Sequence, residues 1–285
     1  MSVGIVGSGR IAQAMGRLLR ERGAEVVVAG RDPARTAEAA RFIGGCRVAG
    51  VDAIAGQSER LLIAVADDTL ARVAALLARG AKPGTIALHT CGVHGASVLE
   101  PLTEVGVHCG ALHPMATVPS PTAGLRILTG ASYGFTGGER ARAWATEILE
   151  SLQGRMYDIP ESARALYHAA AALACNSIPG LLDAASTMLA ASAGTSKAEA
   201  LKLLEPLVRA SLDNTFELGP EAALTGPVRR GDPATLRLHL QAISTQSPAI
   251  GDLYRAIGVW QAELARRAGL DEEKVKLMEE AFRNE

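Results

Sequence analysis

The sequence is poor in aromatic residues, in cysteine and in any excess of charge. Phe, Trp and Tyr make up 4% of the 285 residues, so alanine, leucine and valine must fill the core, which favours closely packed helices. The net charge is −1, from 29 basic and 30 acidic side chains. A surface that binds nucleic acid needs a basic stripe, and because this balance indicates none, we expect no nucleic-acid partner.

The four cysteines are widely spaced and contain no Cys-x-x-Cys pair. This pattern predicts reduced thiols in a cytoplasmic protein, and it argues against a disulfide framework or a zinc site. His94 and His108 have no accompanying ligand pattern, so we predict no metal.

Signals for secretion or membrane insertion are also missing. The first residues lack the basic segment and long apolar core of a signal peptide. No apolar run reaches the roughly 18 residues of a membrane span. The longest candidate, residues 169–182, is interrupted by Asn176 and Pro179. We therefore expect a protein without membrane contact.

What the first half does contain is an alternation of short apolar runs and helical patterns. The expected strands are residues 3–6, 25–29, 61–65, 85–88, 107–112, 132–135 and 155–159. The expected helices are residues 11–22, 36–42, 69–77 and 139–152. Strands that alternate with helices predict βαβ units, and hence an α/β fold with a doubly wound, mainly parallel sheet of the Rossmann type.

The second half has a different character, with no convincing strand after Pro160. Its helical patterns, rich in alanine and leucine, cover residues 162–191, 197–212, 235–242, 247–268 and 271–283. We therefore predict a Rossmann domain over residues 1–159 and an all-helical domain over residues 160–285.

The strongest motif is a glycine-rich turn between the first strand and the first helix. It has the form G-x-G-x-x-A, with Gly7 for the tight turn, Gly9 for close approach of a pyrophosphate, and Ala12 for packing of helix on strand. Amide groups at the start of a helix bind phosphates well. The predicted dinucleotide contacts are Gly7, Ser8, Gly9, Arg10, Ile11 and Ala12.

The end of the second strand indicates which dinucleotide is bound. An NAD enzyme usually has an acidic residue there for the ribose 2′-hydroxyl, but this chain has Gly30, followed by Arg31 and, shortly after, Arg35. Arginine supplies a counter-charge to a 2′-phosphate, so we predict NADP, with Arg31 and Arg35 among its contacts. Asp32 is the open alternative, because it can take the acidic role one or two positions late.

Polar residues just past the other strand ends are further candidates, since ligands of doubly wound sheets bind at that edge. Ala66 and Asp67 follow one strand, while Asp68 and Thr69 can instead cap the next helix. Thr90 follows the next strand and is expected near the nicotinamide. His113 can exchange a proton with a carbonyl, or it can be a structural histidine before Pro114.

Two segments of the helical half carry further candidates. His168 and Asn176 are eight residues apart and lie on one side of a helix, so both can face the cleft. Asn176 can instead bond a neighbouring helix. Between residues 224 and 232 a Gly/Pro loop presents Thr225 and Arg230, and Arg230 can hold a substrate carboxylate or simply belong to a structural turn. Asp232 is expected to cap the following helix.

These motifs together resemble a known family. They are Gly-Ser-Gly-x-Ile-Ala at residues 7–12, Ala-Val-x-Asp-Asp at 64–68, His-Thr-x-Gly at 89–92, His-Pro-Met at 113–115, Tyr-His-Ala-Ala-Ala at 167–171 with Asn176, and Thr-Gly-Pro-x-x-Arg-Gly-Asp at 225–232. The set resembles Rossmann-like oxidoreductases with a C-terminal helical domain of unknown function. That family lies in the 6-phosphogluconate and β-hydroxyacid dehydrogenase superfamily, and it is related to ketopantoate reductase.

The resemblance implies an NADP-dependent oxidoreductase of a small 2-oxo or hydroxy acid, with ketopantoate as the best single guess. It also implies a homodimer formed through the helical domain. Many β-hydroxyacid dehydrogenases have a catalytic lysine four residues before the asparagine, but Ala172 stands there in this chain. The catalytic candidates are therefore His168, His113 and Asn176. Two alternatives stay open: a non-catalytic NADP-binding sensor or scaffold, and a deazaflavin-dependent NADP reductase.

Overall fold

The computed structural model describes residues 1–283. Its contacts divide the chain into two compact units, Met1–Asn176 and Ser177–Glu285. The division falls later than the boundary predicted after residue 159. The first helix of the second half therefore belongs with the sheet.

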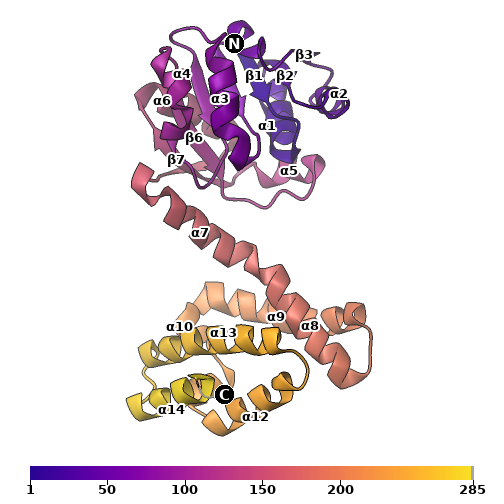
Figure 1. Ribbon diagram of the computed structural model, residues 1–285, viewed down its shortest axis with the longest axis vertical. Coiled ribbons are helices and arrows are strands. Elements are labelled where there is room, and N and C mark those ends of the chain that lie inside the picture. Colours follow the sequence, from indigo (N-terminus) through magenta and orange to yellow (C-terminus); the bar gives the residue numbers. More distant parts are fainter. Residues whose placement is uncertain (284–285) are drawn as a thin grey trace. The chain divides into compact units, whose positions relative to one another are not determined.

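The first unit contains one sheet of eight strands (Figure 1). They are β1 (Ser2–Val6), β2 (Glu25–Ala29), β3 (Arg47–Val48), β4 (Arg60–Ile63), β5 (Ile86–His89), β6 (His108–Pro114), β7 (Ser132–Gly137) and β8 (Arg155–Asp158). Their order is β3-β2-β1-β4-β5-β6-β7-β8, and all neighbours are parallel except β6 and β7. The predicted α/β fold with a mainly parallel Rossmann sheet is thus confirmed.

Helices cover both faces of this sheet (Figure 1). They are α1 (Arg10–Glu21), α2 (Pro33–Phe42), α3 (Leu70–Ala78), α4 (Glu100–Glu104), α5 (Pro121–Ile127) and α6 (Glu139–Leu152). The last helix of this unit, α7 (Arg164–Cys175), adds no residue to either core, and Arg164 is its only buried residue. Side chains alternate between two cores, because successive strand residues point to opposite faces. In β2, Val26 and Val28 enter the core with α1 and α6, while Val27 and Ala29 enter the core with α3.

The elements missing from the sequence prediction are short. β3 has two residues, α4 has five and α5 has seven, so none is long enough to show a hydrophobic period. Four 3-10 turns were also not predicted: η1 (Ile54–Gln57), η2 (Asp67–Thr69), η3 (Ala96–Leu99) and η4 (Glu161–Ala163).

The second unit is entirely helical over its described residues. Its helices are α8 (Ser177–Ala193), α9 (Lys197–Leu218), α10 (Pro220–Ala223), α11 (Gly226–Arg230), α12 (Pro233–Ser244), α13 (Pro248–Arg267) and α14 (Glu272–Arg283). The single helix predicted for residues 162–191 is divided into α7 and α8 at Asn176. Asp232 caps α12 as predicted, since its carboxylate accepts the Thr235 amide at 3.1 Å.

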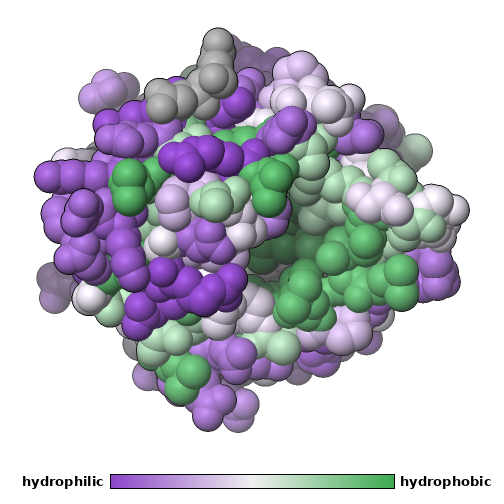
Figure 2. Space-filling view, turned by 90° about the horizontal axis from the view of Figure 1, so that it is seen from below, coloured by the Kyte–Doolittle hydropathy of each residue, from purple (hydrophilic) through white to green (hydrophobic). Residues whose placement is uncertain are grey.

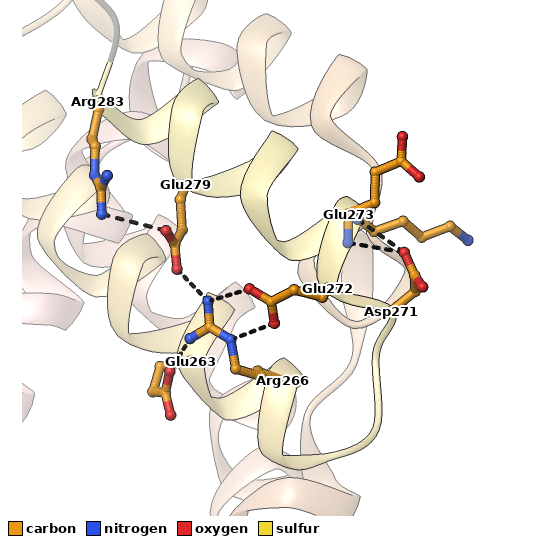
Figure 3. A network of polar contacts seen from close by, with 8 residues as sticks. Glu263, Arg266, Asp271, Glu272, Glu273, Glu279 and Arg283 are labelled. Atoms are coloured by element: carbon orange, nitrogen blue, oxygen red, sulfur yellow. Dashed lines mark hydrogen bonds and ion pairs between the residues drawn. The ribbon is translucent and has the colours of Figure 1, made fainter.

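The core of the second unit lies among α11, α12, α13 and α14, where Leu236, Ala262 and Met278 are fully buried. A charged network joins α13 to α14 on its surface (Figure 3). Arg266 pairs with Glu263, with Glu272 at 3.0 Å and with Glu279 at 2.7 Å. These hydrogen-bonded carboxylates raise the pKa of Arg266, so its charge is fixed at every accessible pH.

One helical stretch among the described residues, Glu161–Ala193, is long and apolar enough to cross a membrane when judged by length and composition alone. None of its most apolar window is buried within the chain.

His89, at the end of β5, is completely buried and joins two backbone segments. Its Nε2 lies 2.8 Å from the Gly95 carbonyl, and its Nδ1 accepts the Cys91 amide at 3.2 Å. These contacts place the proton on Nε2 and leave the imidazole neutral. Burial lowers the pKa of His89 to about 4.

We therefore predict a pH-dependent contribution of His89 to stability. Because the unfolded chain binds a proton to this histidine below about pH 6.5, the contribution is complete above that pH and is lost as the pH falls to about 4. His89→Gln should reduce the acid-induced loss of unfolding free energy by about 3 kcal/mol, measured by urea denaturation at pH 7 and pH 4. The control is His108→Gln at an exposed position. Equal pH dependence in wild type and His89→Gln would refute the assignment.

Candidate functional site

The three small residues of the glycine-rich turn, Gly7, Gly9 and Ala12, have the surroundings that their predicted roles require. Gly7 has φ +128°, and a Cβ there would lie 2.2 Å from the Ala64 carbonyl oxygen, so only glycine fits between β1 and the end of β4. A Cβ on Gly9 would meet nothing within 4 Å, which leaves that side of the turn open. Ala12 is fully buried in the core below α1.

The first turn of α1 has free hydrogen-bonding capacity. Gly9 is its N-cap, and no side chain caps the helix. Amides in the first turn of a helix have no intrahelical acceptor, and the helix dipole adds positive potential there. Ser8 is fixed beside this turn because its carbonyl accepts the Gln13 side chain at 3.0 Å. The turn is therefore suited to bind an anion.

The end of β2 has glycine, not an acidic residue, at the position that usually bonds the ribose 2′-hydroxyl. A Cβ at Gly30 would lie 2.5 Å from Oγ1 of the buried Thr36, so a side chain is excluded there. Asp32 caps α2 by accepting the Arg35 amide at 3.0 Å. This hydrogen bond uses one oxygen, Oδ1, of the residue that was the alternative ribose ligand.

A cleft of about 970 Å³ opens beside the turn, at the carboxyl ends of the strands. Its lining comprises Gly9, Arg10, Ile11, Arg35, Ala64, Val65, Ala66, Asp67, Thr90, His113, Met115, Ala116, Thr117, Val118, His168, Ala170, Ala171, Ala172, Ala174, Cys175 and Asn176. The order of the sheet reverses at β1 and β4, where ligands of doubly wound folds bind.

The cleft therefore gathers most of the predicted site residues from distant parts of the first unit. Of the predicted cofactor contacts, Gly7, Ser8, Ala12 and Arg31 lie outside its lining. Arg31 is exposed at the start of the β2–α2 connection.

His113, Tyr167 and His168 form one aromatic cluster at the end of β6. Nδ1 of His113 lies 2.9 Å from the Tyr167 hydroxyl, and the His113 ring stands edge-on to both neighbours, with ring centres 5.6 Å apart. The cluster packs directly against the main chain of two glycines. A Cβ at Gly92 would lie 2.2 Å from Nδ1 of His168, and a Cβ at Gly134 would lie 2.6 Å from the Tyr167 oxygen.

Both histidines are suited to donate a hydrogen bond from Nε2. Burial, together with the nearby His168 and Arg164, lowers the pKa of His113 to about 4. Nδ1 of His168 is buried without a hydrogen-bond partner. A hydrogen on that atom would have no acceptor, so the tautomer of His168 with hydrogen on Nε2 avoids a buried, unpaired donor.

Arg164 is the residue that the sequence analysis missed. Its guanidinium is 1% exposed and donates to the carbonyls of His94 at 3.0 Å, Gly134 at 3.3 Å and Cys91 at 2.7 Å. These bonds fix the start of α7 to the loop after β5 and to β7. An arginine in an alanine-rich helix gave no signal, because the sequence does not show which carbonyls surround it.

The remaining strand-end residues divide into two groups. Thr90 and Asp67 line the cleft, whereas Cys91 is buried and burial raises the pKa of its thiol to about 11, so it is no nucleophile at neutral pH. The Thr69 hydroxyl donates to the Ala66 carbonyl at 2.8 Å. Neither Thr69 nor Asp68 makes a side-chain cap for α3.

The predicted residues of the helical half lie in different units. Asn176 is the C-cap of α7 in the first unit, and its backbone amide donates to the Ala172 carbonyl. The neighbouring Cys175 thiol lies 2.9 Å from the Thr117 hydroxyl. In the second unit, Thr225 is the N-cap of the short helix α11 and Arg230 is its last residue, and both are exposed.

Comparison with protein-family models gives two matches. Residues 1–114 match a Rossmann-like domain, and residues 131–260 match a domain of unknown function, DUF2520. No curated protein matches the chain.

Several solved structures share the fold over nearly the whole chain. A protein of Bacteroides fragilis, provisionally described as an NADP oxidoreductase, has a TM-score of 0.74 at 20% identity, with 93% of this chain and 98% of that one covered. A protein of Thermotoga maritima gives 0.72 at 21% identity, with the same coverage. A reductive aminase of Aspergillus terreus, in complex with NADPH and ethyl-5-oxohexanoate, gives 0.61 at 20% identity, with 98% and 91% covered. These matches establish a shared two-part architecture, a Rossmann-like domain followed by a helical region.

Proposed function

We propose that the protein is an NADP-dependent oxidoreductase that reduces the C=O or C=N bond of a small organic compound. The observation that carries this proposal is a single cleft that joins the open helix start at Gly9 to two imidazoles, those of His113 and His168. A dinucleotide site and hydrogen-bond donors for a reducible bond are therefore adjacent.

The residues present fit NADP in charge and in space. The uncapped first turn of α1 suits the pyrophosphate, and Gly9 leaves room for it. Arg10 and Arg35 both line the cleft on that side, and Asp32 is engaged in capping α2. Arginine pairs bidentately with phosphate, so this end suits an additional 2′-phosphate.

The chain's own residues would bind and polarise the substrate, while the bound cofactor supplies the hydride. Nε2 of His113 and of His168 would donate to the oxygen or nitrogen on which charge develops. The wall formed by Ala170, Ala171 and Ala172 is small and apolar, and it would exclude water from the reacting bond. Asn176, at the end of this wall, would orient cofactor or substrate.

A 2-oxo acid of the ketopantoate type is our first candidate substrate. The family resemblance supports it, with Arg230 and Thr225 as proposed carboxylate ligands. The second candidate is a ketone condensed with an amine, because a reductive aminase shares the fold.

A screen of NADPH oxidation with 2-oxo acids, with ketones and with ketones plus small amines tests the function. Turnover of any of these supports the proposal, and the better class identifies the substrate. Tight NADPH binding without turnover would instead favour a sensor or scaffold. Turnover only with a deazaflavin would favour a deazaflavin-dependent NADP reductase.

We predict that Arg35→Ala raises the Kd for NADPH by about tenfold, because a charge-assisted bond to the 2′-phosphate is worth about 1.5–3 kcal/mol. The Kd for NADH should not change. Calorimetric titration measures both, with Arg41→Ala, an exposed residue of the same helix, as the control. Arg31→Ala, tested in parallel, shows whether that exposed side chain contributes. Equal weakening of NADH and NADPH binding would contradict the assignment, as would a wild-type preference for NADH.

We further propose that the protein is a homodimer whose helical units pack together. In α8 and α9, Ser186 and Ala200 are the only buried residues. Leu181 and Leu212 are 38% and 40% exposed, and both line an apolar groove of about 360 Å³ among α8, α9 and α13. Hydrophobic residues gather around a hollow on the face shown in Figure 2.

A second copy is the occupant that this surface favours. α8 carries a single charged residue, Asp183, which pairs with Lys197 at 2.5 Å. Obligate homodimer interfaces are large and resemble a divided hydrophobic core. Two copies related by a two-fold axis would offer each other the same apolar face.

Leu212→Glu should convert the dimer to monomer, because it places a charge in the proposed interface. Light scattering coupled to gel filtration measures the mass. Leu238→Glu, on an exposed position of α12, is the matched control and should remain dimeric. A monomeric wild-type protein would refute this proposal without touching the proposed activity.

A further inference from the structure

The two cleft histidines, His113 and His168, differ in the hydrogen-bond partner of their Nδ1 atoms. Nδ1 of His113 contacts the Tyr167 hydroxyl at 2.9 Å, whereas Nδ1 of His168 is buried against Gly92 without a partner. Both rings line the cleft, but Tyr167 does not. A proton given up by His113 can therefore be replaced from the protein, while one given up by His168 cannot.

We propose that Tyr167 is the proton store for the reduction, and that His113 passes its proton to the substrate by exchanging one neutral tautomer for the other. This inference rests on the proposed function. Tyr167 acts through His113, and His168 serves as a second hydrogen-bond donor.

The step balances without a charged imidazole. When the carbon of a C=O bond gains the hydride, the π electron pair moves to oxygen, which takes the proton from Nε2 of His113. Nδ1 of His113 takes the phenol proton of Tyr167, which is left as a phenolate. Solvent then returns a proton to Nε2, and Nδ1 returns its proton to Tyr167.

The surroundings of His113 favour this exchange over a charged intermediate. His168 and Arg164 face it from α7, Asp67 from η2, and His89 from β5. Asp67 is exposed, while Arg164 is buried and permanently charged. Burial and the cation of Arg164 both oppose a second proton on the imidazole.

Arg164 also stabilises the phenolate that the exchange requires. Its guanidinium carbon lies 5.4 Å from the centre of the Tyr167 ring, and its three carbonyl contacts hold it there. Burial raises the pKa of Tyr167, and the Arg164 charge opposes that effect. The transfer is still downhill, since an alkoxide is a stronger base than a phenolate.

Nitrogen NMR of the full-length protein labelled with ¹⁵N-histidine tests the tautomer without any substrate. His113 is identified by comparison with His113→Asn. We expect hydrogen on Nε2 and a hydrogen-bonded acceptor at Nδ1 from pH 5.5 to pH 8, with the Nδ1 signal shifted in Tyr167→Phe but not in Tyr157→Phe. Tyr157 is an exposed tyrosine on β8. Hydrogen on Nδ1 in the wild type, or titration of His113 within this range, would overturn the inference.

Kinetics with a substrate found in the screen supply the second test. Tyr167→Phe should lower kcat about a hundredfold, with KM changed by less than about twofold, and should alter the solvent deuterium isotope effect on kcat. Tyr157→Phe should behave as wild type. An unchanged kcat in Tyr167→Phe would overturn the relay while leaving the oxidoreductase intact. The correct tautomer without any turnover would count against the proposed function alone.

Discussion

The buried guanidinium of Arg164 is the interaction on which the cleft depends. It reaches from α7 to carbonyls that follow β5 and to one in β7, so a single side chain ties the wall of the cleft to two parts of the sheet. A buried cation is expensive unless its donors are satisfied, and here three carbonyls satisfy them. Without it, the positions of Tyr167 and His168, on the next turn of the same helix, would not be fixed. Burial is the main reason that the pKa of the neighbouring His113 is lowered, and the charge of Arg164 adds to it.

The backbone takes part in the site as much as the side chains do. Gly92 and Gly134 lie directly against the aromatic cluster, and neither has room for a Cβ. Gly7 and Gly30 have the corresponding function at the cofactor end, where they bring β1, β4 and α2 close to the turn. In each case the absence of a side chain lets another group approach the main chain closely.

The sequence was sufficient to predict the sheet except for the two-residue edge strand β3, because apolar strand runs and amphipathic helices have strong periodic signals. It predicted β2 and α6 with their observed bounds, and it predicted the glycine turn with a role for each small residue. It also named His113, His168 and Asn176, which the fold brings to one cleft. It could not identify Arg164 or Tyr167, whose roles depend on partners from β5, β6 and β7. Nor could it divide the long helical pattern at Asn176, since alanine-rich sequence continues on both sides.

The apolar surfaces of α8 and α9 have a consequence for how this protein is made in a cell. Thirty-nine residues of helix contain almost no internal core, so their order would come from a bimolecular event. In the proposed dimer, the melting temperature would rise with protein concentration, and freshly synthesised chains would expose apolar helices until they meet a copy. Dilution, rather than heat, would be the gentlest way to unfold the helical half.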